Sequence, residues 1–147
     1  MTSSWTQIGS DINGKTSGDK AGYASLSSDG STLAIGSSYN DENGKDSGHV
    51  RVFKNINDTW TQVGADIDGE GAGDKSGGAG SVSLSGDGSI LAIGARYNGE
   101  NGVDSGHVRV FKLTEISSDK AINISTDSGK YLLIKEPKTF AEAVTTS

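Results

Sequence analysis

The sequence predicts an all-β protein made of two tandem repeats. Residues 5–9 (Trp-Thr-Gln-Ile-Gly) return 55 positions later as residues 60–64 (Trp-Thr-Gln-Val-Gly), and residues 46–54 return unchanged 58 positions later as residues 104–112. Apolar residues alternate with polar ones in short runs separated by Gly, Asp and Asn, which is the spacing of strands and turns. A repeat of this length indicates a solenoid, a propeller or a similar array.

Each repeat is predicted to contribute a four-stranded sheet. The first two strands of each repeat are predicted to be joined by an Asp-Gly turn, at Asp29-Gly30 and at Asp87-Gly88. Tight hairpin turns need positive φ, which these residue types adopt most easily. Three residues inserted near 78–80 mark a loop or a strand end. The predicted strands are residues 23–27, 32–37, 49–54 and 60–64, then 79–85, 90–95 and 107–112.

Composition narrows the classes of function. The 147 residues carry a net charge of −6 and no cluster of Lys or Arg, so no nucleic-acid partner is expected. There is no cysteine, which excludes disulfides, thiolate metal sites and a cysteine nucleophile. No secretory signal and no apolar run of about 18 residues is visible, so we expect no membrane partner.

Short motifs in both repeats occur in the same order. Residues 22–26 are Gly-Tyr-Ala-Ser-Leu, residues 33–36 and 91–94 are both Leu-Ala-Ile-Gly, and residues 48–53 are Gly-His-Val-Arg-Val-Phe. In this combination the chain resembles the FG-GAP repeat family, the blades of integrin-α-type β-propellers. The resemblance covers residues 5 to about 112. It implies two propeller-type blades within residues 1–114, as repeats 5–59 and 60–114, followed by a tail of residues 115–147.

Calcium-binding members of that family carry an Asp-x-Asp-x-Asp-Gly loop where this chain has only Asp29-Gly30 and Asp87-Gly88. These turns offer too few oxygens for calcium, so the resemblance implies no bound metal or other cofactor here. Acidic loops elsewhere leave calcium open as an alternative. The candidate ligands are Asp11, Asp19, Asp66 and Asp74. We favour the interpretation that they shape turns by bonding to neighbouring backbone.

Residues 46–49 (Asp-Ser-Gly-His) contain the residue types of a hydrolase triad, but strand neighbours point to opposite faces and do not converge. The chain is therefore not predicted to be an enzyme. His49 and Arg51, like His107 and Arg109, are predicted to share one strand face and to pair with Asp side chains of an adjoining blade.

Trp5 and Trp60 begin outer strands, where an indole ring covers a blade edge while its N–H reaches water. A sugar-binding aromatic platform is the alternative for these two rings. In the tail, residues 121–125 and 130–136 are predicted strands, and residues 139–144 are predicted to form one or two helical turns with Phe140 and Val144 on one side. We expect this tail to anchor the protein to a larger protein assembly, and alternatively to act as a lid on the last blade.

Two repeats cannot close a propeller, which needs about four to eight blades. The start at Met1 and the non-repeat tail favour a complete product whose copies assemble, and a homotrimer with six blades is our choice. The second repeat lacks a Trp-Thr-Gln strand, whereas residues 5–9 form one with no blade before it, so we expect neighbouring chains to exchange this strand.

The expected function is a structural and interaction module on a virion or another extracellular assembly, such as a decoration or fibre component. The alternative is an adhesion module that binds a glycan or protein ligand on its loop face.

Overall fold

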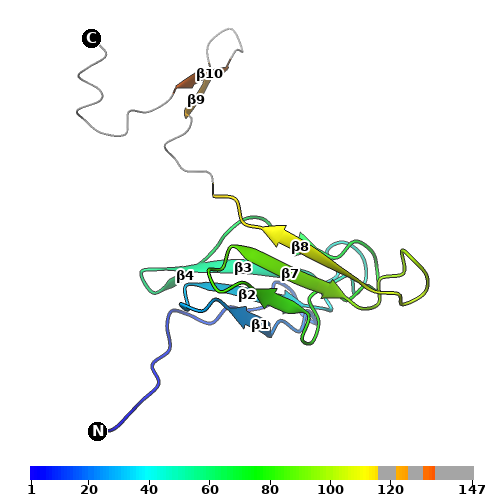
Figure 1. Ribbon diagram of the computed structural model, residues 1–147, viewed down its shortest axis with the longest axis horizontal. Coiled ribbons are helices and arrows are strands. Elements are labelled where there is room, and N and C mark those ends of the chain that lie inside the picture. Colours follow the sequence, from blue (N-terminus) through cyan, green and yellow to red (C-terminus); the bar gives the residue numbers. More distant parts are fainter. Residues whose placement is uncertain (116–121, 126–130, 135–147) are drawn as a thin grey trace. The chain divides into compact units, whose positions relative to one another are not determined.

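A computed structural model describes residues 1–115, 122–125 and 131–134. The chain divides into two compact units, Met1–Leu113 and Thr114–Ser147 (Figure 1). All regular elements in the described residues are β-strands, and none is a helix. The prediction of an all-β fold is therefore confirmed.

The first repeat forms an antiparallel sheet of five strands. Four of them lie side by side in chain order: β1 (Tyr23–Leu26), β2 (Thr32–Ser37), β3 (His49–Ile56) and β4 (Thr59–Gln62). The fifth, β5 (Ile67–Asp68), pairs with the start of β3 through Val50. All four strands predicted for this repeat are present, whereas β5 was not predicted because two residues are too few to show a period.

The second repeat forms an antiparallel sheet of only three strands, in the order β6 (Val82–Leu84), β7 (Ile90–Ala95) and β8 (His107–Lys112). The described chain thus supplies three of the four strands of this repeat, as the sequence predicted, and the supply of the fourth by a neighbouring chain stays a prediction. The reason for the three strands lies in the sequence after Lys112, which continues Leu-Thr-Glu with no second copy of the Trp-Thr-Gln strand. The outer edge of β8 carries no neighbouring strand in the described residues.

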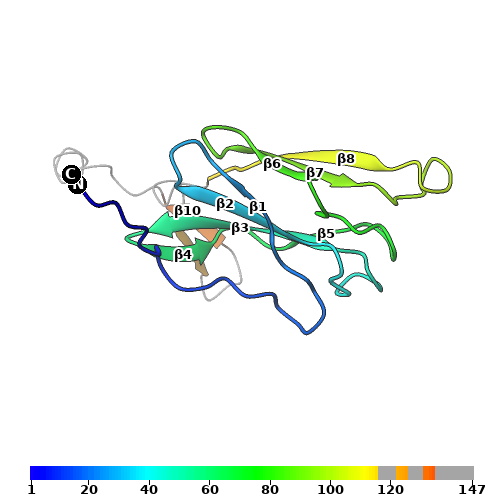
Figure 2. The same cartoon turned by 90° about the horizontal axis from the view of Figure 1, so that it is seen from below.

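The two sheets pack face to face, with the second sheet lying over the first (Figure 2). Alternation along the strands brings Ala34 and Val50 of the first sheet against Leu91 and Ile93 of the second, and these four residues form the buried core. The backbone N–H of Leu84 also donates to Ser25 Oγ at 3.0 Å. Residues far apart in sequence are therefore joined mainly by burial of aliphatic side chains, which is the largest favourable contribution to folding.

The two Asp-Gly turns are held by the same local hydrogen bonds. Asp87 Oδ1 accepts from Ser85 Oγ at 2.7 Å and from the backbone N–H of Ser89 at 3.0 Å, and Asp29 bonds its own neighbours in the same way. Because these bonds favour the ionised carboxylate, the Ser85 hydroxyl and the Ser89 backbone lower the pKa of Asp87 to about 2. The carboxylates of Asp29 and Asp87 therefore accept hydrogen bonds within their own turns.

In the second compact unit, β9 (Ile122–Ser125) and β10 (Tyr131–Ile134) form an antiparallel pair in which Tyr131 lies opposite Ser125. Both strands predicted in the tail are confirmed at their centres. The predicted helical turns with Phe140 and Val144 lie outside the described residues. In the described part of the chain, no helix has the length and apolar character needed to cross a membrane.

Candidate interaction surfaces

The predicted row of basic residues is confirmed on one face of β3 and β8, but its partners differ from those expected. Arg51 Nη2 donates to the backbone carbonyl of Asn13, and Arg109 Nη2 to that of Asp68, both at 2.6 Å. For the two arginines, main-chain oxygens thus replace the predicted Asp side chains. Arg51 thus holds the loop before β1 across the face of its own sheet, whereas Arg109 of the second sheet reaches β5, the short strand that pairs with β3 in the first sheet.

His49 is fully buried beneath a group of charged side chains. Its Nδ1 lies 3.7 Å from Asp66 and 3.9 Å from Glu42, and Lys15 Nζ bridges the same carboxylates at 2.7 and 2.8 Å. Hydrogen bonds to Asp66 and then to Glu42 raise the pKa of Lys15. Burial lowers the pKa of His49 although Asp66 opposes this shift, so the imidazole is held neutral.

The second repeat changes this cluster, because Lys15 is replaced and Asp66 has no counterpart after Lys112. Glu70 stands where the repeat places Lys15, and its carboxylate lies 3.6 Å from His107 Nδ1 and 3.8 Å from Arg109. The lysine bridge is therefore specific to the first repeat. Sequence reasoning missed both clusters, although the substitution of Lys15 by Glu70 is visible in the repeat alignment.

The described residues contain two groups of carboxylate and imidazole side chains that could hold a metal ion. In each group the ligand atoms lie within 4.8 Å of one another, and the groups are Glu42–His49–Asp68 and Glu70–Glu100–His107. Asp11, Asp19, Asp66 and Asp74, which were the calcium candidates, belong to neither group. In the first group the ammonium of Lys15 already neutralises Glu42. The residue types in both groups can ligate a cation, but their geometry does not assign a particular ion to either group.

The loop carboxylates among those candidates are bonded to the chain around them. Buried Asp19 accepts from the backbone N–H of Thr16 at 3.0 Å and from Asn40 Nδ2 at 3.2 Å. Buried Asp74 accepts from the N–H of Gly71 at 3.0 Å and from Asn98 Nδ2 at 2.9 Å. These bonds support the turn-shaping interpretation, because they satisfy the carboxylates within the protein.

Asp11 and Asp66 accept from glutamines four positions earlier in the chain. Gln7 Nε2 donates to Asp11 at 2.8 Å, and Gln62 Nε2 donates to Asp66 at 2.6 Å. This bond has the same place in both repeats, and Asp66 also bonds Lys15. The four calcium candidates therefore all have polar partners in the chain.

The triad-like segment does not converge. Ser47 Oγ donates to the backbone carbonyl of Asn40 at 3.3 Å, and neither ring nitrogen of His49 has a hydrogen-bond partner within the described residues. No bond therefore links the hydroxyl to the imidazole.

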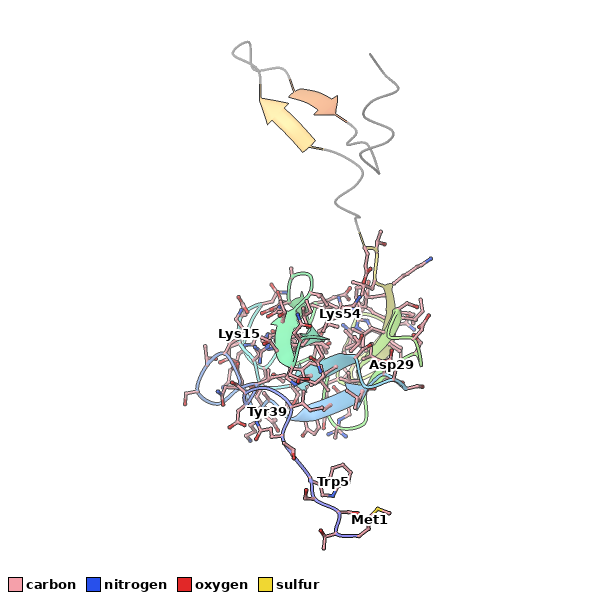
Figure 3. The ribbon with its side chains drawn as sticks, turned by 90° about the vertical axis from the view of Figure 1, so that its left-hand side faces the viewer. Met1, Trp5, Lys15, Asp29, Tyr39 and Lys54 are labelled. Atoms are coloured by element: carbon pink, nitrogen blue, oxygen red, sulfur yellow. The ribbon has the colours of Figure 1, made fainter. Side chains whose placement is uncertain are left out.

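The two tryptophans have different surroundings. Trp60 Nε1 donates to the backbone carbonyl of Ile8 at 3.0 Å, so this ring is part of the contact between β4 and the N-terminal segment. Trp5 is fully exposed and extends away from the sheets (Figure 3). An exposed indole at this position is available either to another chain or to a ligand.

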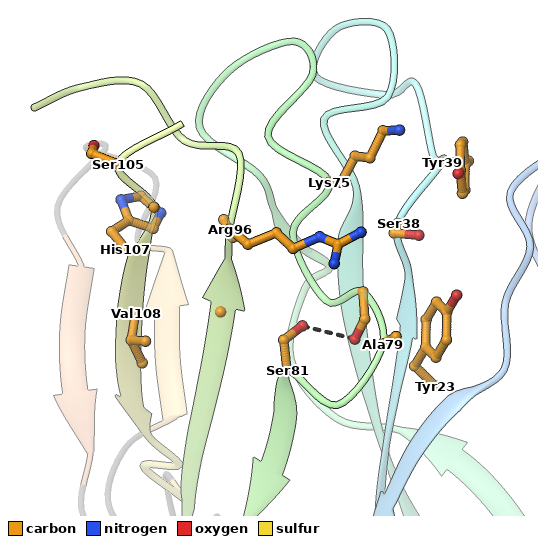
Figure 4. A pocket seen from close by; sticks show the side chains of 14 residues that line it. Tyr23, Ser38, Tyr39, Lys75, Ala79, Ser81, Arg96, Ser105, His107 and Val108 are labelled. Atoms are coloured by element: carbon orange, nitrogen blue, oxygen red, sulfur yellow. Dashed lines mark hydrogen bonds between the residues drawn. The ribbon is translucent and has the colours of Figure 1, made fainter. Parts of the chain in front are cut away.

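A cleft of about 490 Å³ opens between side chains of both repeats (Figure 4). Tyr23 and Tyr39 line it from the first repeat, and Arg96 and His107 from the second. Lys75 also lies in its wall, with Nζ 4.7 Å from the centre of the Tyr39 ring. The cleft thus combines aromatic rings with cationic groups in a protein of net negative charge.

An exposed apolar face lies on the outer side of the second sheet. Val108 and Val110 of β8 are 67% and 66% exposed, whereas Val50, the equivalent of Val108, is completely buried at 0%. Residues 49–54 and 107–112 are identical, but the second sheet covers only the first of these two segments. Together with the outer edge of β8, which no strand of the described residues pairs with, this face is the clearest candidate for an interaction surface.

Searches against family models, curated proteins and solved structures found no match to this chain. The resemblance to FG-GAP repeats accordingly stays a prediction from the motifs.

Burial of His49 predicts a pH dependence of stability. Its folded pKa lies below the unfolded value of 6.5, so the unfolded chain binds a proton more readily, and stability falls as pH decreases through that value. Denaturation midpoints between pH 7.5 and 5.5 should show this slope, and His49→Gln should remove most of it. His107→Gln is the matched control and should keep the slope; an unchanged slope in His49→Gln would contradict the assignment.

Proposed function

We propose that the protein is a non-catalytic structural and interaction module whose copies join head to tail in a closed ring. The observation that carries this proposal is the exposed apolar face of β8, whose equivalent on β3 is covered by another sheet. A soluble chain rarely leaves such a face bare, and heterologous contacts between identical chains close into rings when their rotation permits. Three copies make six propeller-type blades.

The ring belongs, in this proposal, to a virion or another extracellular assembly as a decoration or fibre component. The division of the chain at Thr114 supports a separate role for the tail, which attaches the ring to a larger protein assembly. The repeated, glycine-rich sheets with their carboxylates bonded into loops suit a passive building block.

An adhesion module is the second candidate, and the cleft between the repeats favours it. Tyr39, Lys75 and Arg96 present ring faces and cations to one space, which is suited to an anionic glycan or an acidic protein segment. A glycan array separates the two functions: binding that Lys75→Ala abolishes supports adhesion, and an absence of any binding supports the structural role.

The native mass in solution tests the ring directly. Light scattering coupled to size-exclusion chromatography should give three times the mass of one chain across micromolar concentrations. A single-chain mass at every concentration would refute self-assembly.

Removal of the tail tests its role as an attachment. A chain truncated after residue 116 should keep strands β1 to β8 and the same number of chains per particle as the full chain, because the two sheets lie within Met1–Leu113. It should no longer associate with the assembly from which the full chain is recovered. Loss of folding or of the ring on truncation would show instead that the tail completes the core.

A further inference from the structure

The chain contains one complete interface between successive repeats. Ala34 and Val50 on one face of the first sheet pack against Leu91 and Ile93 of the second. Beside this apolar contact, the loop that precedes the second sheet runs along the loop before β3. The N–H groups of Gly69, Lys75 and Ser76 donate there to the carbonyls of Gly48, Asp46 and Ser47 at 2.7, 3.0 and 3.0 Å.

The acceptor side of that interface is repeated, uncovered, in the second repeat. Val108 is the equivalent of Val50, and it is exposed. The equivalents of Asp46 and Ser47 are Asp104 and Ser105, whose carbonyls receive no backbone hydrogen bond from residues 1–115. This surface, formed by residues 103–108 with Ala92 and Val110, is named the acceptor surface below.

The donor side is repeated, equally uncovered, in the first repeat. Its loop of residues 13–22 corresponds to residues 68–77. On the sheet beside it, exposed Leu26 corresponds to Leu84, which packs on the core. This surface, formed by residues 13–22 with Leu26, is named the donor surface.

Gly14 gives an independent sign of what touches the donor surface. At its equivalent, Gly69, an added Cβ would lie 2.0 Å from the carbonyl oxygen of Ser47, so no other residue fits. At Gly14 the nearest atoms to such a Cβ are the Cβ atoms of Asp19 and Ala21, at 3.4 and 3.5 Å, which is ordinary contact. The single chain therefore has no steric need for glycine at position 14.

Part of the wall of the cleft between the repeats is equivalent to a surface of the first repeat that the second repeat covers. Gly94, Gly106 and Val108 line it, and their equivalents in the first repeat are Gly36, Gly48 and Val50. Ser76 and Gly77 contact all three of those equivalents. The counterparts of Ser76 and Gly77 on the donor surface are Ala21 and Gly22.

We infer that the acceptor surface of one chain binds the donor surface of a second copy of the same chain, in the register of the internal interface. Gly14 of the partner subunit then lies against Ser105, and Ala21 and Gly22 of the partner subunit fill the cleft beside Gly106. This inference rests on the proposed ring, and it specifies which surfaces join and in what register. Tyr97, which is partly exposed, takes Lys20 of the partner subunit over its ring, as Tyr39 takes Lys75.

The test compares Gly14→Ala with Gly71→Ala by native mass and by concentration-dependent dissociation. Gly14→Ala should weaken assembly at least tenfold while the dissociated chain keeps its spectrum and melting temperature. Gly71→Ala is the matched control, because an added Cβ there has only ordinary contacts with Asp74, the nearest at 3.6 Å, and Thr16 occupies the equivalent position in the first repeat. It should assemble as the unmodified chain does.

A second pair covers the case in which Gly14→Ala affects folding. Val108→Asp on the acceptor surface should dissociate the ring, whereas Ile56→Asp, at an exposed strand residue outside both surfaces, should not. If rings form but neither Gly14→Ala nor Val108→Asp weakens them, the register is wrong and the proposed ring stands. If the unmodified chain is monomeric at all concentrations, both proposals fail.

Discussion

Deletion of residues 1–9 is expected to give monomers or open-edged, aggregating chains in place of the proposed closed ring. These residues form no strand in the single chain, and Trp5 is fully exposed. Among the residues that the structure describes, the second sheet meanwhile ends at β8 with no strand paired to its outer edge. An exposed edge presents a row of backbone donors and acceptors that invites pairing with another chain. The deletion removes the segment that we expect to satisfy it.

The internal repeat predicts the register of this exchanged strand. In the first sheet, β4 pairs with β3 so that Gln62 lies opposite Phe53 and Trp60 opposite Asn55. The same register on the next chain places Gln7 of the partner subunit opposite Phe111 and Trp5 of the partner subunit opposite Leu113. The indole of that Trp5 then donates to the carbonyl of Val63, as Trp60 donates to the carbonyl of Ile8.

Trp5→Ala is the milder form of the same experiment and should weaken the oligomer more than an ordinary surface substitution, whose effect is within about 0.5 kcal/mol. Ser3→Ala, two residues earlier in the same segment, is the control and should have no effect. Sedimentation across a concentration series measures both. If the chain lacking residues 1–9 forms the same closed oligomer and melts at the same temperature, strand exchange is excluded, and the tail strands become the candidates for completing the second sheet.

The repeat made most of the fold predictable from sequence. Strict alternation and Asp-Gly turns located β2, β3, β7 and β8, since the first three have buried residues and β8 alternates between half-buried and exposed ones, so that each pattern is clear. The missing fourth strand of the second repeat followed from the absence of a second match to residues 5–9. Strand β5 was not predicted, because its pairing with β3 depends on a tertiary contact and not on local pattern.

The site was less predictable because its partners come from distant loops. Sequence placed His49 and Arg51 on one face, but the acceptor for Arg51 is the carbonyl of Asn13, and a backbone oxygen carries no mark in a sequence. The bridge from Lys15 to Glu42 and Asp66 joins three loops. Alignment of the two repeats would have flagged it, since Lys15 becomes Glu70 while His49 stays His107.

Gly36→Ala is expected to give the largest loss of stability among single substitutions in the first sheet. Gly36 lies in β2 where the loop of the second repeat crosses it. An added Cβ would stand 2.0 Å from the carbonyl oxygen of Gly77 and 3.0 Å from Val82 Cγ2. The oxygen belongs to the backbone and cannot rotate away, so the two sheets must separate locally and lose contact in the core of Val50 and Ile93.

Overpacking of a well-packed site costs about 1–3 kcal/mol and occasionally more, which is a large share of the roughly 5–15 kcal/mol that stabilises a typical domain. Urea denaturation should show this loss at several protein concentrations, because assembly adds a concentration-dependent contribution. Gly99→Ala is the matched control: its Cβ would meet only the Gly102 carbonyl oxygen at 3.8 Å, so its denaturation midpoint should not move. A Gly36→Ala protein as stable as the unmodified chain would show that the two sheets do not pack against each other at this point, and the internal interface from which the assembled register is copied would lose its basis.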